Sequence, residues 1–339
     1  MRQLRSSTII GTGMFLPEKR LTNFDLEKMV DTSDEWIVTR SGIRERRIVE
    51  PHQKLSDIAL PAAQMALRNS GVAPEKINAV ILATFTADRP ISATACVLQH
   101  KLGCVNAAAM DIEVACSGFV YATAIAHQFV ATGAMDYVLV IGADILSKVL
   151  DFTDRNTCVL FGDGAGAVVV GPATRDGEGI FDTYLGADGS GSEHIKIPAG
   201  GSELPTSAET VAKRLHYVQI NGKEVFKFST RIVGDMIEKV LTRNQLTLDD
   251  VALIIPHQAN IRIIESAANR FNCPMDKFFT NLDKYGNTVA GTIPICLHEA
   301  LEQKRIKPGD LVLLVGFGGG LTYGLVALRW GSYQLPAAV

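Results

Sequence analysis

The sequence lacks any long apolar run, and its few cysteines form no recognisable motif. No window approaches the roughly 18 consecutive apolar residues of a membrane span. Residues 1–17 hold an apolar stretch that is too short and too interrupted by glycine for a secretory signal peptide. The six cysteines form no Cys-x-x-Cys pair and no Cys/His ligand spacing. These absences disfavour a disulfide framework and a metal site, and they predict a cytoplasmic protein with free thiols.

Charge of either sign is in no large excess. The formal net charge is −3, with 20% charged and 47% apolar residues, which is ordinary for a soluble globular enzyme. This balance gives no sign of a nucleic-acid partner, although a local basic patch stays possible. The 339 residues suffice for one large domain or two of ordinary size, with ample core.

Apolar runs of strand length alternate with segments of helical periodicity, which is typical of a layered α/β fold. Several runs are apolar throughout, as in strands that are buried on both faces. The predicted strands cover residues 7–13, 79–85, 107–115, 137–143, 166–172, 253–258 and 311–317. The predicted helices cover residues 56–69, 117–132, 225–244, 260–271 and 291–303. Residues 186–220, rich in glycine, serine and proline, are predicted to form a loop or cap.

The order of these elements repeats with an offset of about 172 residues. Ala79 and Val251, in matching strand contexts, are 172 positions apart, and Cys116 and Asn287 are 171 apart. A near-constant offset over half the chain predicts a duplicated α/β unit with halves at 1–174 and 175–339. Cys116 and Asn287 would then occupy equivalent ends of the two halves. Chance similarity between α/β segments is the alternative.

Three residues that follow strand-like runs carry the clearest chemical signal. Cys116 precedes a helical segment, and a helix N-terminus should lower the pKa of its thiol. His257 lies at a sharp strand-to-helix turn, and Asn287 lies in a glycine-flanked turn. A thiol can carry an acyl group, while an imidazole and an amide can donate hydrogen bonds to a thioester oxygen. Each also has an ordinary structural interpretation: a buried inert cysteine, a core or surface histidine, and a turn asparagine.

Two glycine-rich segments could be taken for nucleotide-binding loops. The backbone N–H groups of GFGGG at 316–320 could form an oxyanion hole, a tight turn or a phosphate cradle. A phosphate-binding glycine loop should open a helix. Strand-forming residues follow this loop and also FGDGAGA at 161–167, so nucleotide binding is not expected.

Taken in order, the motifs of this chain resemble those of the β-ketoacyl-[acyl carrier protein] synthase III family of the thiolase superfamily. They are DTSDEWIVTRSGIRERR (31–47), ACSGF (115–119), FGDGAGA (161–167), PHQANIRII (256–264), GNT (286–288) and FGGG (317–320). The resemblance covers essentially the whole chain. It implies a thiolase-like, five-layered αβαβα fold of two duplicated halves, assembled as a homodimer.

The resemblance also implies an acyltransferase activity that initiates type II fatty acid synthesis. An acyl-CoA primer is condensed with malonyl-[acyl carrier protein] to give 3-oxoacyl-[acyl carrier protein], with no cofactor. Cys116 would take the acyl group, while His257 and Asn287 would hydrogen-bond the malonyl thioester oxygen as CO2 leaves. The backbone N–H groups of Cys116 and Gly319 would stabilise the oxyanion. Phe317 would favour the uncharged malonyl group and help to expel CO2.

Further residues match positions that bind the two substrates in the family. The coenzyme-A-contacting positions are Thr32, Trp36, Arg40 and Arg155. The basic positions that dock the acidic carrier protein are Lys227, Arg262 and Arg270. Without the resemblance, each would be interpreted as part of a solvated charged surface, although tryptophan and arginine suit adenine and phosphates.

Two positions depart from the family pattern. Ile91 stands where an aromatic residue often reaches across the dimer to close the acyl pocket, so a longer or branched primer is conceivable. Lys223 stands where a polar amide is common near the pantetheine of coenzyme A.

Two alternative functions remain open at this point. A specialised relative could prime polyketide or other secondary-metabolite synthesis, although Asn287 favours condensation. A thiol hydrolase could also use Cys, His and Asn, but the cysteine motif of papain-like enzymes is absent.

Overall fold

Nine strands join edge to edge in the computed structural model, which describes residues 4–335, in the order β11-β12-β13-β8-β1-β7-β6-β4-β5. The first set is β1 (Ser7–Phe15), β4 (Ala79–Ala83), β5 (Ala108–Ile112), β6 (Val138–Asp144) and β7 (Gly164–Pro172). The second set is β8 (Gly179–Ala187), β11 (Val251–Pro256), β12 (Leu311–Gly318) and β13 (Thr322–Arg329). The two sets are joined where Ser7 of β1 pairs with Ile180 of β8.

The second set repeats the order and the directions of the first. In the first set, β1 is antiparallel to β7, β7 is antiparallel to β6, and β6 is parallel to β4. In the second set, β8 is antiparallel to β13, β13 is antiparallel to β12, and β12 is parallel to β11. A parallel bridge between Ile254 and Phe278 stands where β4 pairs with β5 in the first set. The duplication is therefore confirmed, and we propose that the halves divide at residue 174, between β7 and β8.

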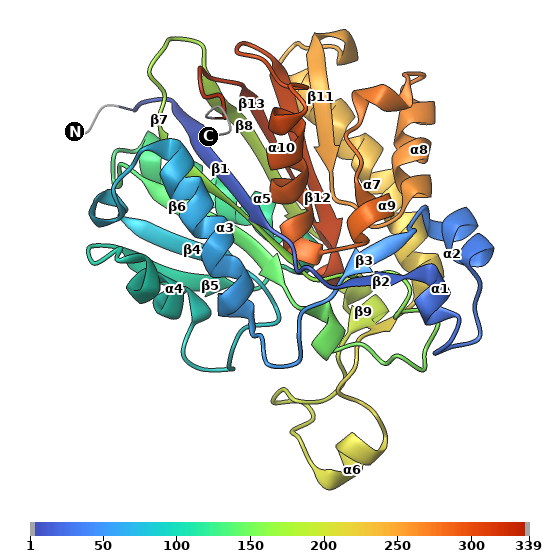
Figure 1. The fold of residues 1–339 in the computed structure, drawn as a ribbon. Coiled ribbons are helices and arrows are strands. Elements are labelled where there is room, and N and C mark those ends of the chain that lie inside the picture. The colour runs from blue at the N-terminus through green and yellow to red at the C-terminus, as the bar shows by residue number, and fades with distance from the viewer. Residues whose placement is uncertain (1–3, 336–339) are drawn as a thin grey trace.

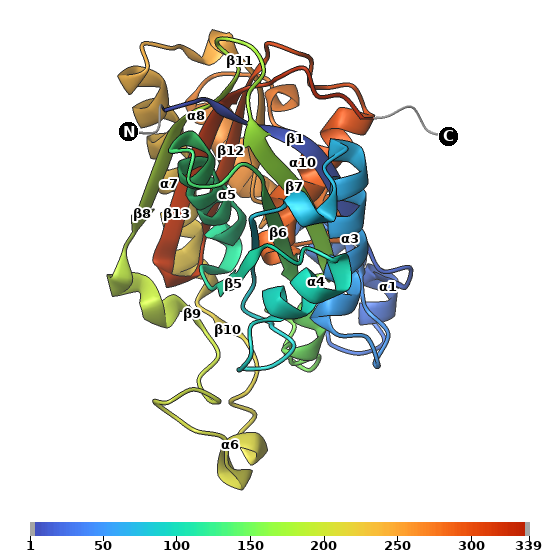
Figure 2. The same ribbon diagram turned by 90° about the vertical axis from the view of Figure 1, so that its left-hand side faces the viewer.

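Three layers of helices alternate with the two sets of strands (Figures 1 and 2). On the outer face of the first set lie α3 (Leu55–Ser70) and α4 (Thr94–Leu102). Between the two sets lie α5 (Gly118–Ala131) and α10 (Thr292–Glu302). The outer face of the second set is covered by α7 (Gly222–Arg243) and α8 (Ile261–Arg270). The predicted five-layered αβαβα fold is confirmed.

The strands β4, β6 and β12 are largely apolar and buried at every position, because helices cover both of their faces. In β4, Val80 and Leu82 pack against the outer helices, whereas Ile81 packs into the middle layer. The seven predicted strands all occur, and the five predicted helices end within three residues of their predicted bounds. The strand β8 was not predicted, because its exposed and half-buried positions give it no continuous apolar run.

The remaining elements surround the ends of the sheets. They are β2 (Arg20–Thr22), α1 (Asn23–Leu26), α2 (Asp34–Ser41), β3 (Glu45–Arg47), β9 (Ile195–Lys196), α6 (Ala208–Ala212), β10 (Gln219–Ile220) and α9 (Leu282–Tyr285). Within the predicted cap 186–220, β9 pairs with β10, and α6 projects away from the body (Figures 1 and 2). Among residues 4–335, no helix is long and apolar enough to cross a membrane.

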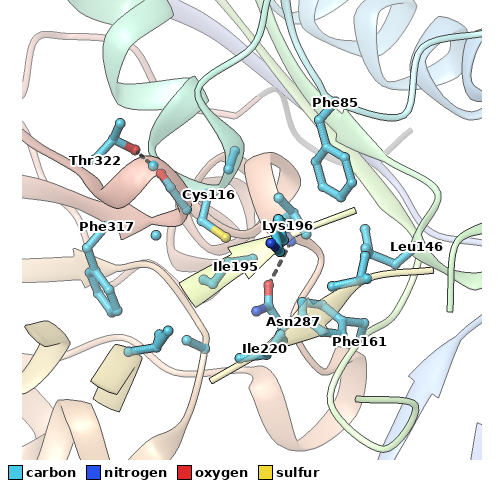
Figure 3. A pocket seen from close by; sticks show the side chains of 18 of the residues that line it. Phe85, Cys116, Leu146, Phe161, Ile195, Lys196, Ile220, Asn287, Phe317 and Thr322 are labelled. Atoms are coloured by element: carbon cyan, nitrogen blue, oxygen red, sulfur yellow. Dashed lines mark hydrogen bonds between the residues drawn. The ribbon is translucent and has the colours of Figure 1, made fainter. Parts of the chain in front are cut away.

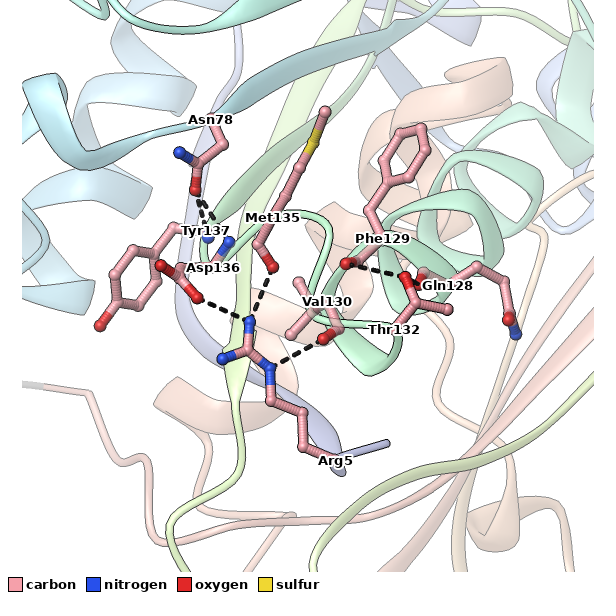
Figure 4. Close-up of polar contacts among 9 residues, drawn as sticks. All are labelled: Arg5, Asn78, Gln128, Phe129, Val130, Thr132, Met135, Asp136 and Tyr137. Atoms are coloured by element: carbon pink, nitrogen blue, oxygen red, sulfur yellow. Dashed lines mark hydrogen bonds and ion pairs between the residues drawn. The ribbon is translucent and has the colours of Figure 1, made fainter. Parts of the chain in front are cut away.

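Arg5 anchors the N-terminal segment to the C-terminal end of α5 (Figure 4). Its guanidinium donates hydrogen bonds to the carbonyl oxygens of Val130 and Met135, both at 2.8 Å, and pairs with Asp136 at 2.7 Å. A cation at this end of a helix also complements the helix dipole. Arg5 therefore stabilises the packing of α5 against the first strands.

Replacing Arg5 with alanine should lower the free energy of unfolding by about 1–2 kcal/mol, because two carbonyl groups lose a charged donor. Denaturant unfolding followed by circular dichroism measures this change. Arg20→Ala is the matched control, since Arg20 makes only an exposed 3.5 Å pair with Glu45 and should change stability by less than about 0.5 kcal/mol. Equal stabilities for the two variants would contradict the assigned role of Arg5.

Candidate active site

Cys116 lies in a tight turn between β5 and α5. Residues Ala115–Ser117 form a short 3-10 turn that leads directly into α5. Ala115 adopts a left-handed φ of 42°, a strained conformation of the kind that clusters at functional sites. The Cys116 side chain is 9% exposed, and the backbone N–H of Gly319 donates a hydrogen bond to its sulfur.

The same turn recurs at the start of α10. Residues Val289–Gly291 form a 3-10 turn, and Val289 has a φ of 49°. This alignment makes Ala290 the structural counterpart of Cys116, and Asn287 lies three residues earlier. The predicted equivalence of Cys116 and Asn287 is therefore wrong by three positions, because the sequence offset averages over loops of different length.

Burial raises the pKa of the Cys116 thiol to about 12. Desolvation disfavours the thiolate, and the nearby carboxylate of Asp144 adds to the effect, while the N–H of Gly319 opposes it. The prediction of a lowered pKa is wrong in direction, because it considered the helix terminus and not the burial of the thiol. Cys116 is thus a neutral thiol at pH 7.

His257 directly follows the last residue of β11. Its backbone N–H donates to the carbonyl oxygen of Val315 in β12 at 2.8 Å, which extends the parallel pairing. The side chain is 1% exposed, and burial lowers the pKa of its imidazole to about 3. The ring meets Phe317 edge-on, with 5.2 Å between centroids, and its Nδ1 lies 2.8 Å from Oγ1 of Thr292. His257 is therefore a neutral imidazole whose Nε2 is the ring nitrogen left for a substrate.

Asn287 is held by its backbone, and its side chain has a fixed orientation. The backbone N–H donates to the carbonyl oxygen of Leu160 at 2.9 Å, and the carbonyl oxygen accepts from the N–H of Gly162 at 3.1 Å. The side-chain oxygen accepts from the N–H of Val289 at 2.8 Å. Because that backbone N–H can only donate, the Oδ1 atom is identified and the Nδ2 amino group remains as a donor.

A buried polar network joins the residue after His257 to the turn before Asn287. Gln258 Oε1 accepts from the backbone N–H of Asn281 at 3.2 Å. Glu299 accepts from Asn281 Nδ2 at 2.9 Å and from the hydroxyl of Tyr285 at 2.6 Å. Because each group is satisfied inside the protein, the network fixes the two catalytic segments relative to one another.

Two further groups lie near the cysteine: Gly318, which belongs to the glycine-rich segment 316–320 noted in the sequence, and Asp144, which the sequence analysis did not identify. A Cβ at Gly318 would lie 2.6 Å from the Cβ and 2.9 Å from the Sγ of Cys116, so only glycine fits there. Asp144, at the end of β6, accepts from the N–H groups of Phe85 at 3.0 Å and Ala290 at 3.2 Å. Burial raises the pKa of Asp144 to about 6. A carboxylate ending an apolar strand was the available signal for Asp144.

The three predicted catalytic residues line one cavity of about 840 Å³. Cys116 and Asn287 point into it in Figure 3, and Gly319 and Phe317 also contribute to its wall. On one side the wall is apolar, and it consists of Phe85, Leu146, Phe161 and Val289 among others. The structure thus brings a thiol, an imidazole and an amide donor together beside an apolar pocket.

A second cavity of about 710 Å³ lies between the first one and the surface around α2. The two share the lining residues Leu160, Ile220, Gly222 and Asn260. Trp36 and Arg40 line the outer cavity, and Lys223 also reaches it. Trp36 and Arg40, two of the four predicted coenzyme-A-contacting residues, therefore line a cavity that borders the one around Cys116.

Trp36 is the centre of a cationic cluster at this mouth. The guanidinium groups of Arg40 and Arg155 lie 4.8 and 5.0 Å from its ring. Arg155 also donates to the carbonyl oxygen of Asp31 at 2.9 Å, which places it beside Thr32. The Thr32 hydroxyl is buried without a hydrogen-bond partner among the described residues.

The remaining predicted residues lie outside the cavities. Ile91 is 85% exposed and does not line the cavity of its own chain. Lys227 and Arg262 are exposed next to lining residues of α7 and α8. Arg270 pairs with Asp235 and Glu238, each at 2.7 Å, so its charge is largely neutralised within the protein. Within residues 4–335, there is no group of three or more His, Cys, Asp or Glu side chains that could hold a metal ion.

Comparison with known proteins identifies the family. The models for 3-oxoacyl-[acyl-carrier-protein] synthase III and for its C-terminal part match residues 110–189 and 241–330. The β-ketoacyl-[acyl-carrier-protein] synthase III of Caldanaerobacter subterraneus is 54% identical over 95% of this chain and 97% of its own length.

Solved structures agree. The 3-oxoacyl-[acyl-carrier-protein] synthase III of Aquifex aeolicus has a TM-score of 0.89 and 45% identity, over 96% of this chain and 100% of that one. The priming β-ketosynthase of the R1128 polyketide pathway has a TM-score of 0.90 and 31% identity, over 98% and 99% of the two chains. The chain therefore belongs to the β-ketoacyl-[acyl carrier protein] synthase III family.

Proposed function

We propose that this enzyme condenses an acyl-CoA primer with malonyl-[acyl carrier protein] to form 3-oxoacyl-[acyl carrier protein], the first condensation of type II fatty acid synthesis. The observation that carries the proposal is the meeting of Cys116, His257 and Asn287 in one cavity. The Asn287 amide is oriented as a donor and cannot abstract a proton. The site therefore suits a reaction whose carbanion arises without a strong base.

The first half-reaction transfers the acyl group to the enzyme. The sulfur of Cys116 attacks the acyl carbon, the bond from that carbon to the coenzyme A sulfur breaks, and the thiol proton ends on the released coenzyme A. The negative oxygen of the intermediate accepts from the backbone N–H groups of Cys116 and Gly319. Since the Cys116 thiol is neutral at pH 7, its proton leaves as the bond forms.

The second half-reaction extends the chain. The bond to the malonyl carboxylate breaks, CO2 departs, and its electron pair forms an enolate whose oxygen accepts from His257 Nε2 and Asn287 Nδ2. The enolate carbon attacks the acyl carbon on Cys116, and the released sulfur takes up one proton. Because decarboxylation supplies the electron pair, no cofactor is needed. The apolar side chain of Phe317 packs against His257, and such an uncharged surface disfavours the charged carboxylate relative to CO2.

Coenzyme A is assigned to the outer cavity. The ring of Trp36, with Arg40 and Arg155 against it, suits the adenine and its phosphates. The unpartnered hydroxyl of Thr32 is available to the nucleotide, and Lys223 supplies a further cation in the outer cavity. The pantetheine would follow the shared lining residues to Cys116.

The carrier protein is assigned to the exposed cations beside the cavity. Lys227 and Arg262 lie next to Phe226 and Ile263, which line the cavity, so an acidic partner docked there would present its prosthetic arm to the cavity. Arg270 can contribute only by giving up its pairs with Asp235 and Glu238. It is therefore the weakest of the three assignments.

A homodimer fits the apolar surface that this chain leaves exposed. The strand β5 forms an open edge of the sheet, a template for pairing with a second copy. Phe181 and Leu185 are 41% and 37% exposed on β8, and Ile91 would reach the partner's acyl pocket. The cytoplasm is the proposed location, because all six cysteines are free and Cys116 must stay reduced to act.

Intact mass after incubation with a panel of acyl-CoAs tests the function. Acetyl and branched short-chain CoAs should each leave one acyl group on Cys116, and malonyl-[acyl carrier protein] should then remove it. The preferred primer reports the effect of Ile91 on the pocket. Adducts only with unusual acyl groups would favour the priming of polyketide synthesis, as the R1128 relative is named. Rapid hydrolysis of every adduct would favour a thiol hydrolase instead.

A further inference from the structure

One chain of hydrogen-bonding groups connects His257 to Asn287. The Nδ1 atom of His257 lies 2.8 Å from Oγ1 of Thr292, the first residue of α10. The same Oγ1 lies 2.9 Å from the carbonyl oxygen of Val289, whose N–H donates to Asn287 Oδ1. All four residues are nearly fully buried, so water does not compete for these contacts.

The hydroxyl of Thr292 carries one proton and has two possible acceptors. If it donates to Val289, then His257 must place its proton on Nδ1, and Nε2 becomes an acceptor. If it donates to His257, then Nδ1 is the acceptor and the ring proton lies on Nε2. No heavy atom needs to move between these arrangements, because both distances are within hydrogen-bond range.

The carbonyl group of Val289 does not require the hydroxyl. It already accepts a hydrogen bond from the backbone N–H of Thr292, which closes the 3-10 turn. Turning the hydroxyl toward His257 therefore leaves the Val289 carbonyl satisfied by the backbone N–H of Thr292. The hydroxyl is thus free to donate to His257 Nδ1, which lies 2.8 Å away.

We propose that Thr292 is a positioning residue that sets the tautomer of His257, by donating its hydroxyl proton to Nδ1 and so placing the ring proton on Nε2. This inference rests on the donor role proposed above for His257. Burial keeps the imidazole neutral, so a protonated ring cannot supply both N–H groups. With the other tautomer, an Nε2 lone pair would face the enolate oxygen and repel it.

The tautomer can be measured without any substrate. In the enzyme labelled with 15N-histidine, the nitrogen shifts distinguish a protonated from an unprotonated ring nitrogen. The His257 signals are assigned by their loss in His257→Ala, among seven histidines in the chain. We expect an unprotonated Nδ1 and a protonated Nε2 at pH 7. A protonated Nδ1 would overturn the proposal.

Two substitutions test the consequence for catalysis. Thr292→Val keeps the shape and removes the hydroxyl, so kcat for malonyl decarboxylation should fall at least about tenfold, part of the loss expected for an oxyanion donor. The KM for malonyl-[acyl carrier protein] and the acylation of Cys116 should stay within about twofold, since neither uses the His257 donor. Thr292→Ser should restore most of kcat. A kcat within twofold of wild type for Thr292→Val would overturn the proposal.

The matched control is Thr123→Val in α5. Thr123 is equally buried, and its hydroxyl bonds only to the carbonyl oxygen of Phe119 in the preceding turn. It should lose similar stability and keep its kcat, and a loss of kcat equal to that of Thr292→Val would point to destabilisation and overturn the proposal. If wild type has the Nε2 proton but decarboxylates nothing, the proposed function fails while the role of Thr292 stands.

Discussion

Cys116→Ala should abolish acyl transfer from every acyl-CoA, so that the intact mass of the variant stays unchanged after incubation. Alanine has no nucleophile, and no other thiol lies within the catalytic cavity. The side chain is 9% exposed and small, and the glycine loop around Gly318 leaves room for a methyl group in its place. The variant should therefore fold normally and bind acyl-CoA.

The experiment must distinguish acylation of Cys116 from acylation of the other cysteines. Cys96 is exposed, so acyl-CoA at high concentration could acylate it without catalysis, and peptide mapping must locate each adduct. Cys96→Ala should retain full activity, because Cys96 lies on α4 outside the cavity. Substantial condensation by Cys116→Ala would remove the cysteine from its assigned role.

The reactivity of Cys116 toward a general alkylating agent should rise with pH without a plateau. The thiolate is the nucleophile, and with a pKa of about 12 its fraction grows about tenfold per pH unit from pH 6 to pH 10. Rates of carbamidomethylation by iodoacetamide, measured by mass spectrometry on the free enzyme, check this expectation. A plateau near neutral pH would mean that the helix terminus outweighs burial.

The second large effect on activity is expected when either hydrogen-bond donor, His257 or Asn287, is removed. His257→Ala and Asn287→Ala should each lower malonyl decarboxylation by about 10²-fold or more, the usual loss for one oxyanion donor. Both variants should still acylate Cys116, because that step uses the backbone N–H groups of Cys116 and Gly319. Release of CO2 and the appearance of acyl-enzyme, measured separately, distinguish the half-reactions.

Asn287→Asp provides a sharper test than alanine. A carboxylate still accepts from the N–H of Val289, which keeps the turn, but it presents an oxygen where the amide presented a donor. It should be at least as impaired as Asn287→Ala. The double variant of His257 and Asn287 should lose less than the product of the single losses, because the donors act on one oxygen. Normal decarboxylation in both single variants would refute their role.

The sequence predicts the layers of this fold well because they follow from local patterns. The apolar period of each strand and helix, and the repeat between the halves, are readable without tertiary contacts. Cys116 and His257 were recognisable because they follow the strands β5 and β11, and such ends meet at one edge of a sheet. Asn287 follows the helix α9 instead, and its signal was the glycine-flanked GNT motif.

The buried polar groups that contact the segments of these three residues could not be recognised from the sequence, because their roles depend on contacts between distant segments. Thr292 lies 35 positions from His257, and Asp144 lies 146 from Ala290. Neither belongs to a local motif. The predicted pKa shift of Cys116 had the wrong direction for the same reason, since the helix terminus is visible in the sequence and the depth of burial is not.

The division of the site between the two halves has a consequence for folding. Cys116 comes from the first half, while His257 and Asn287 come from the second, and Asn287 is paired through its backbone with residues 160–162 of the first. Neither half can possess the complete site before the halves dock, and larger proteins gain such contacts late in folding. During refolding, the circular dichroism signal of the helices should thus return before condensing activity. The rate at which enzyme turnover returns then measures the final docking step.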